Sequence, residues 1–301
     1  VSLPPVQKRL RNVAEHELTT LLGTRVTIGD LDIIPFNNAI VKDVTIADNN
    51  GDTALYIKRI AAGLDMYNLL IRNRISVSYT VISGVEAHIS RDSINAPLNI
   101  QHIIDALKPK EKNKPPTRFE FNANTIILRQ WDVTYDIKSE PYQSDRFDSN
   151  HISVSNLRAD LRLPLIKNDD FTIDIRRLAF EEQSGLTITN VTGLFHISDK
   201  GLSTTGVVAE MPATRIEFGD IAIAYDGWGK LNDRITTMPL SLKIVNSSYF
   251  TPSDIRAFIP ALAHFDSTLD LDIDAHGSMK RLDLYLSLIH ISEPTRPRLI
   301  S

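Results

Sequence analysis

The sequence predicts a mainly β protein: a long, curved antiparallel sheet with an apolar groove along one face and a few short helices. The first observation is strict alternation of apolar and polar residues between Gly23 and Asp48, where Val26 and Ile28 flank Thr27. Alternation indicates a strand with one apolar face, because successive side chains of a strand point to opposite faces. The second observation is repetition: roughly 15 such segments follow one another, most of them separated by short turn sequences.

Composition narrows the class of protein. Of the 301 residues, 42% are hydrophobic, which is enough for a core, and the net charge of −4 combines both signs. Such a charge offers no basic stripe for nucleic acid. The chain has no cysteine, which excludes disulfide frameworks and thiolate chemistry. No run of about 18 apolar residues is present, so the sequence predicts no membrane-spanning helix.

Both ends of the sequence are unusual. The chain opens at Val1 rather than at a methionine, and we expect a fragment whose natural N-terminus lies upstream. The stretch from Leu286 to Arg296 reads as the translation of a sequencing adapter, and it breaks the preceding strand pattern. We therefore treat residues 286–301 as a non-native tail and leave them out of the fold prediction.

Residues 1–23 are expected to form a membrane-proximal helical segment. Apolar residues recur at spacings of three and four from Val6 to Leu22, which places them on one face of a helix. Pro4-Pro5 before the pattern and Gly23 after it are typical helix boundaries. Basic residues near its start favour an amphipathic helix beside a membrane. A helix that caps the end of a β-core fits the same pattern, and both interpretations can hold together.

Residues 24–107 are expected to form a first segment of the groove. The predicted strands cover about 25–34, 39–48, 54–66, 75–82 and 85–90, with a helical turn near 67–70 and a short helix at 99–107. Asn50-Gly51 between two alternating runs is a hairpin signal. The run at 108–117 is charged, rich in proline and free of apolar residues, so we expect a linker there.

Residues 118–285 are expected to form a second groove segment. Apolar residues alternate near 131–137, 157–163, 171–175, 186–197, 202–209, 215–225, 240–245 and 269–275. Between the last two runs, Thr251 and Pro252 indicate the start of a short helix at 252–259. A hydroxyl side chain at the cap and a proline in the first turn favour such a start.

We find no motif for catalysis, for a cofactor or for a metal. The sequence lacks a nucleophile elbow, a phosphate loop and a zinc-protease motif. The acidic turn from Asp48 to Asp52 departs from the spacing of a calcium loop. Asp270, Asp272 and Asp274 would stand about 7 Å apart along a strand, where we expect them to face solvent. The sequence therefore predicts a protein that is not an enzyme.

The apolar face of such a sheet has to be covered. Two sheets could cover each other in a sandwich, or a single sheet could curl into a trough that leaves its lining for a ligand. At about 4.8 Å per strand, roughly 15 strands would make a trough on the order of 70 Å long, which suits acyl chains better than one small molecule. The candidate lining residues are Val26, Ile28, Val44, Ile46, Val133, Tyr135, Leu161, Ile173, Ile175, Leu271 and Ile273.

Several motifs, taken in order, resemble the TamB/AsmA family of periplasmic proteins. They are Leu3-Pro4-Pro5-Val6-Gln7, Val26-Thr27-Ile28-Gly29, Pro35-Phe36-Asn37, Gly51-Asp52-Thr53, Pro97-Leu98-Asn99-Ile100-Gln101, Ile104-Asp105-Ala106-Leu107, Thr251-Pro252-Ser253-Asp254-Ile255 with Phe258, and Gly277 with Leu282. Each motif alone has low specificity, and the resemblance, from residue 3 to about residue 285, depends on their order and spacing.

The resemblance implies a protein anchored in the inner membrane by a helix upstream of Leu3, with a periplasmic β-rich groove. Members of this family are bridge-like lipid transporters, implicated in moving phospholipid to the outer membrane and in assembling outer-membrane proteins. The sequence departs from the family in lacking both the anchor and the C-terminal domain that meets the outer membrane. We therefore expect the proximal part only, with phospholipids as ligands and an outer-membrane assembly protein as a further partner.

Two other functions remain open at this point. A periplasmic scaffold could bind unfolded outer-membrane proteins by adding their strands to an exposed sheet edge, in which case edge backbone and not groove lining would carry binding. A β-sandwich that binds or hydrolyses carbohydrate would require clustered aromatic residues or a close pair of carboxylates. Aromatic residues make up only 7% of the chain and are dispersed, which argues against the carbohydrate protein.

Overall fold

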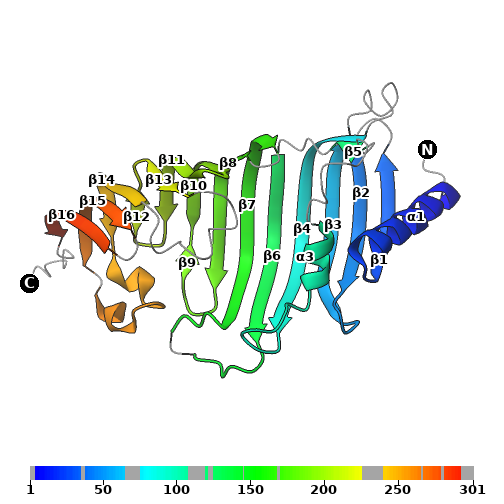
Figure 1. The fold of residues 1–301 in the computed structure, drawn as a ribbon, viewed down its shortest axis with the longest axis horizontal. Helices are drawn as coiled ribbons and strands as arrows, with labels where there is room; N and C mark the ends of the chain where they lie inside the picture. The colour runs from blue at the N-terminus through cyan, green and yellow to red at the C-terminus, as the bar shows by residue number, and fades with distance from the viewer. Residues whose placement is uncertain are drawn as a thin grey trace, which may run out of the picture. The chain divides into compact units, whose positions relative to one another are not determined.

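A computed structural model describes residues 4–34, 38–64, 75–107, 119–120, 125–144, 146–167, 170–225, 240–265, 267–278 and 281–292. They form one large, mostly antiparallel sheet with few helices (Figure 1). This confirms the predicted mainly β fold. The predicted helical turn at 67–70 and the linker at 108–117 lie outside the described residues.

The strands follow one another in the sheet nearly in chain order. Their bounds are β1 Val26–Ile34, β2 Asn38–Ala47, β3 Thr53–Leu64, β4 Ile75–Arg91, β5 Phe119–Glu120, β6 Thr125–Ile137, β7 His151–Lys167, β8 Asp170–Glu182, β9 Thr187–Ile188, β10 Asn190–Ser198, β11 Gly201–Glu210, β12 Arg215–Glu217, β13 Ile221–Ala224, β14 Leu240–Phe250, β15 Thr268–Ser278 and β16 Arg281–Ser292. Neighbours along the sheet are β1-β2-β3-β4-β6-β7-β8-β10-β11-β12-β14-β15-β16; in addition β13 pairs with β11 and β14, β5 with β4, and β9 with β8.

One neighbouring pair departs from the predicted antiparallel order. Strands β4 and β6 run parallel, in register from Tyr79 opposite Thr125 to Arg91 opposite Ile137. A parallel neighbour requires a crossover connection instead of a hairpin, and this connection contains helix α3 (Gln101–Leu107). The crossover is what brings a helix onto the sheet in this region.

The helices match the predicted positions with different details. Helix α1 spans Pro4–Leu22, close to the predicted bounds. The expected helix at 252–259 is instead a pair of 3-10 turns, η2 (Pro252–Ile255) and η3 (Pro260–His264). The two turns are separated at Ile259, whose φ and ψ of −131° and 85° are not helical, because a proline disfavours helical conformation in the residue that precedes it.

The chain divides into two compact units at a different place from the predicted linker. The first unit contains Val1–Ser144 and Asp148–Asp160, and the second contains Asp145–Phe147 and Leu161–Ser301. The division therefore falls within β7. Strands β4 and β6, on either side of the predicted linker, belong to the same unit because they pair along most of their length.

The predicted boundary near residue 286 also falls inside a strand. Strand β16 continues to Ser292, and it pairs with β15 on both sides of that position, from Ser278 opposite Arg281 to Thr268 opposite Ser292. The loss of the alternating pattern after residue 285 thus does not end the strand.

In the first unit, the alternation of apolar and polar residues shifts by one position partway along each of several strands. This phase change occurs at positions that are in register on neighbouring strands. Two consecutive polar or glycine residues separate the apolar ones there: Gly29-Asp30, Lys42-Asp43, Lys58-Arg59, Ser83-Gly84 and Arg129-Gln130. Asp43, Gly84 and Gln130 have φ angles of 53°, 65° and 57°. A left-handed residue resets the alternation, so apolar residues three apart, such as Ile82 and Val85, both pack against the core.

This phase change corrects the prediction of two strands at 75–82 and 85–90. Ser83-Gly84 was expected to separate them, but β4 is continuous through this point. Gly84 is required there for two reasons: its φ angle is 65°, and a Cβ atom would come within 2.8 Å of the Lys58 Cβ on β3. Glycine is the residue that adopts this conformation without steric cost.

Candidate functional site

In the first unit, the predicted lining residues share one face of the sheet. The register aligns them in two rows that cross strands β1, β2, β3, β4 and β6: Val26, Ile46, Leu55, Ala87 and Val133 in one, and Ile28, Val44, Ile57, Val85 and Trp131 in the other. Tyr135 continues this face two residues beyond Val133, opposite Ile89. The register therefore brings the predicted residues of this unit together on one face of the sheet.

Helices α1 and α3 cover this face. Leu22 belongs to the same buried cluster as the strand residues, and Leu18 of α1 and Ile103 of α3 pack against it. Val26 and Val44 are each only 4% exposed. Here the candidate lining is a packed protein core, and α1 packs on it as a cap. The position of this helix beside a membrane stays a prediction.

Polar residues of α1 also occupy the outer edge of β1. Thr19 Oγ1 accepts a hydrogen bond from the Val26 amide (3.1 Å), and Glu15 Oε1 accepts one from the Ile28 amide (2.7 Å). Arg11 Nη1 donates to the Gly29 carbonyl (2.9 Å). Because residues four apart lie on one side of a helix, these three side chains form a row parallel to the strand, and they satisfy backbone groups that an edge strand otherwise exposes.

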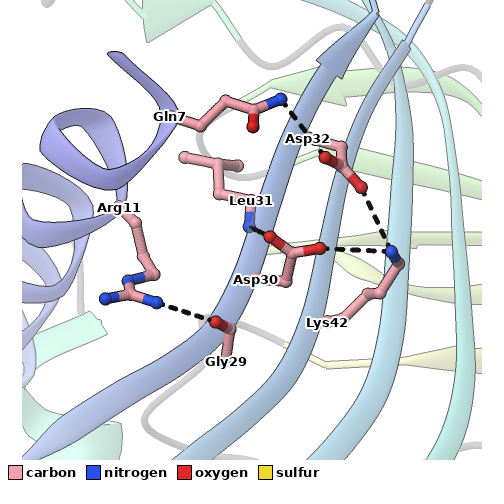
Figure 2. Close-up of polar contacts among 7 residues, drawn as sticks. All are labelled: Gln7, Arg11, Gly29, Asp30, Leu31, Asp32 and Lys42. Carbon is pink, nitrogen blue, oxygen red and sulfur yellow. Dashed lines mark hydrogen bonds and ion pairs between the residues drawn. The ribbon is translucent and has the colours of Figure 1, made fainter. Parts of the chain in front are cut away.

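Figure 2 shows the N-terminal end of this contact. Gln7 Nε2 donates to Asp32 Oδ1 (3.3 Å), which extends the α1 row by one more turn. On the strand side, Lys42 of β2 bridges Asp30 (3.2 Å) and Asp32 (3.1 Å). The hydrogen bonds that Lys42 donates to these two carboxylates, that to Asp32 first, raise the pKa of Lys42. Lys42 therefore holds Asp32, the strand residue that accepts the hydrogen bond from α1, in place.

The segment before α3 is fastened to the ends of β2 and β4 by one asparagine. Asn99 Oδ1 accepts from the Ser90 amide (2.9 Å), and Asn99 Nδ2 donates to the His88 carbonyl (2.9 Å) and to Asp48 Oδ2 (3.4 Å). Asp48 is itself buried, and its Oδ1 accepts from the amides of Asn50 and Asp52. The acidic turn at 48–52 is thus an amide-binding turn that positions α3.

The second unit has the same kind of apolar face with less covering it. Its register aligns two rows across β8, β10, β11 and β13: Phe171, Ile197, Leu202 and Ile223 in one, and Ile173, Phe195, Thr204 and Ile221 in the other. All of these except the buried Thr204 are only partly buried. The described residues of this unit form no α-helix, and their helical elements are the 3-10 turns η2 and η3 (Figure 1).

The remaining predicted residues also lie in this unit. Ile175 extends the line of Phe171 and Ile173 along β8. Ile273 on β15 is opposite Ile244 of β14, and Leu271 follows on the same face of β15. Leu161 lies on β7 and is partly buried. This face also contains six apolar residues that are not among the predicted lining residues, although they alternate just as regularly: Phe171, Phe195, Ile197, Leu202, Ile221 and Ile223.

The His151 ring has both of its nitrogens and one of its edges or faces in contact with named partners. Its Nδ1 lies 3.2 Å from Asp136 Oδ1, its Nε2 lies 2.9 Å from the Glu140 carbonyl, and Tyr142 packs edge-on at 5.8 Å. The hydrogen bond with Asp136 is the largest cause of the raised pKa of His151. Desolvation lowers this pKa by a smaller amount, and the Glu140 carbonyl and the nearby Asp148 raise it further. Both ring nitrogens hold the loop between β6 and β7, so this is a structural contact.

Among the described residues, no group of three metal-ligating side chains is placed to hold an ion, and no helix is long and apolar enough to cross a membrane. Asp270, Asp272 and Asp274 are partly buried, and the last is in register with Lys243 of β14. Asp226-Gly227-Trp228-Gly229, a short glycine-rich stretch, lies outside the described residues.

In comparison with known proteins, no family model, no curated protein and no solved structure matches the chain.

Proposed function

We propose that this chain is part of a TamB/AsmA-like envelope protein whose apolar sheet face carries phospholipid acyl chains between the inner and outer membranes. The observation that supports this most directly is the apolar face of the second unit, which no α-helix covers among the described residues of that unit. Phe171, Ile173, Phe195, Ile197 and Leu202 lie side by side on three strands and are only partly buried. A contiguous apolar surface that stays partly accessible to solvent is the kind of surface on which an apolar ligand can bind.

The chemistry of the two rows suits an acyl chain. Neither row contains a charged side chain, so a hydrocarbon lying across them meets apolar groups on every strand. Burial of apolar surface contributes about 25 cal/mol per Å², and a lining of uniform character keeps that free energy nearly constant along the path. A lipid can then slide without a deep minimum, with its headgroup in water. No residue acts as a catalyst in this mechanism.

The first unit supports the same idea by contrast. There, Leu18, Leu22 and Ile103 fill the corresponding face with the protein's own apolar side chains. The face of the second unit has the same row arrangement and lacks such a cover among the described residues. In our proposal, acyl chains supply it. The protein would be periplasmic and held at the inner membrane by a segment upstream of this chain.

A periplasmic scaffold that works by strand addition is the alternative that we rank second. It needs backbone groups that are free at a sheet edge. At β1, the Val26 and Ile28 amides and the Gly29 carbonyl are already bonded to α1. An incoming strand would have to displace the helix first. The lipid carrier needs no such displacement, which is why we prefer it.

The proposal is tested by purifying the whole chain in mild detergent and identifying bound lipids by native mass spectrometry. We expect phospholipid on the parent protein and much less on an Ile173→Asp/Leu202→Asp variant, which places charge in both rows. The matched control is Ser203→Asp/Thr205→Asp, on the opposite face of β11, where both residues are exposed. A folded parent without lipid, or equal lipid on both variants, would refute the carrier.

A further inference from the structure

The loop between β6 and β7 closes around one histidine ring. His151 Nδ1 lies 3.2 Å from Asp136 Oδ1 on β6, and His151 Nε2 lies 2.9 Å from the backbone carbonyl of Glu140 in the loop. The His151 side chain is only 13% exposed, and the ring of Tyr142 packs edge-on against it. The histidine thus joins the strand to the loop through both of its nitrogens.

Both partners of the ring are hydrogen-bond acceptors. An ionised carboxylate and a carbonyl oxygen accept hydrogen bonds and cannot donate them. A neutral imidazole carries one N–H, whereas a protonated imidazole carries two. Only the protonated ring of His151 can therefore donate to Asp136 and to the Glu140 carbonyl at the same time. A neutral ring has to turn a lone pair toward one of these two oxygens.

We propose that His151 is a proton-operated clasp, which holds the turn at Glu140 when its ring is charged and releases that turn when the ring is neutral. A hydrogen bond to a carboxylate is stronger than one to a carbonyl. The neutral ring should therefore keep its single N–H on Asp136 and give up Glu140. Histidine is the side chain whose charge changes most readily near neutral pH. The clasp does not rest on the proposed lipid carrier.

The charged groups that face the ring favour the closed clasp. The hydrogen bond with Asp136 is the largest cause of the raised pKa of His151, desolvation lowers this pKa by less, and Asp148 in the loop raises it further. The Glu140 carboxylate is turned to Ser139, whose Oγ donates to it (3.1 Å). Because the folded pKa is raised above 6.5, the clasp is closed below pH 6.5 and opens as the pH rises through the folded pKa.

The release is confined to a short turn because the loop has other attachments. The Lys138 amide donates to the Arg91 carbonyl (3.0 Å), and the Gln143 amide donates to Asp148 Oδ2 (3.0 Å). Neither bond involves the His151 ring. Opening the clasp therefore frees the turn at Glu140, which lies between these two attachments, and leaves the rest of the contact in place.

The test is amide hydrogen exchange of the whole chain by NMR at a series of pH values, with each rate divided by that of an unstructured peptide. We expect the Glu140 amide, bonded to the Ile137 carbonyl, to lose protection as the pH rises through the folded pKa. The loss should be about tenfold for each unit by which that pKa exceeds the pKa of a released ring. The Lys138 amide should change little.

Two variants and one further signal make the outcome decisive. His151→Gln should abolish the pH dependence, and His196→Gln, which alters a histidine 3.4 Å from Asp170 in the second unit, should keep it. In the parent, nitrogen NMR of the neutral His151 ring should show the proton on Nδ1. Glu140 protection that does not vary with pH, pH dependence that survives in a folded His151→Gln, or a proton on Nε2 would each overturn the clasp.

Discussion

The carboxylate of Glu15 on helix α1 accepts a hydrogen bond of 2.7 Å from the backbone amide of Ile28 on edge strand β1. A side chain thus takes the place that a neighbouring strand would otherwise fill. With Thr19 bonded to Val26 and Arg11 bonded to Gly29, the helix closes this edge to other strands. Edge protection of this kind is a common way to prevent aggregation through unpaired strands.

Replacing Glu15 by alanine should release the Ile28 amide. We expect a loss of about 1–3 kcal/mol in the free energy of unfolding, because the amide loses a charged acceptor in a partly buried place. Hydrogen exchange should become faster at Ile28 while the Val26 amide, bonded to Thr19, stays protected. Glu17→Ala, at an exposed position on the same helix, should change stability by less than about 0.5 kcal/mol. Unchanged exchange at Ile28 would contradict this role.

Replacing Asn99 by alanine should destabilise the protein more than the same replacement at its exposed neighbour Asn95. Asn99→Ala removes the acceptor of the Ser90 amide and two donated hydrogen bonds, and leaving such groups unpaired costs about 1–3 kcal/mol. Urea unfolding measures the loss. In addition, proteolysis near α3 should become faster, since this contact fastens the segment that precedes the helix. Asn95→Ala, at an exposed position, is the matched control, and an equal effect of the two changes would rule out the fastening role.

The contact between His151 and Asp136 should make stability depend on pH. Because the folded pKa of His151 is raised above its usual value of 6.5, the contact stabilises fully below pH 6.5, and this stabilisation is lost as the pH rises through the folded pKa. Asp136→Asn should therefore destabilise the protein most just below pH 6.5 and progressively less above it.

Urea unfolding of the parent and of Asp136→Asn at a series of pH values checks this, and NMR titration of the His151 ring gives the folded pKa directly. The pKa should fall in Asp136→Asn and stay in place in Asp199→Asn, a control at an exposed position of the second unit. If the difference in the free energy of unfolding between the parent and Asp136→Asn grew with rising pH, the contact would not stabilise the protein in the way described.

Much of the fold follows from local pattern. Alternation identified the strands, and it placed Val26, Ile28, Val44 and Ile46 on one face, because side-chain direction in a strand is set by position alone. The pattern failed where three-dimensional neighbours decide. The reset at Gly84 depends on Lys58 of another strand, and the parallel pairing of β4 with β6 depends on where α3 packs.

The candidate site was predicted less completely for the same reason. Whether an apolar face is covered is a tertiary property. Val26 and Ile173 look alike in the sequence, yet the first is buried beneath α1 and the second is only partly buried. The spacing of Arg11, Glu15 and Thr19 on α1 is visible in the sequence. It indicates a polar side of the helix but not the strand edge to which that side bonds.

In the proposed lipid carrier, acyl chains lie on the face that carries Phe195. Incorporating the photo-crosslinker p-benzoyl-L-phenylalanine in place of Phe195, and separately in place of Leu194, tests it most directly. Leu194 is the adjacent residue on β10, is exposed and points to the opposite face. After irradiation of protein purified from cells, mass spectrometry should find phospholipid attached at position 195 and little at position 194. Lipid attached equally at both positions, or at neither, would contradict the account.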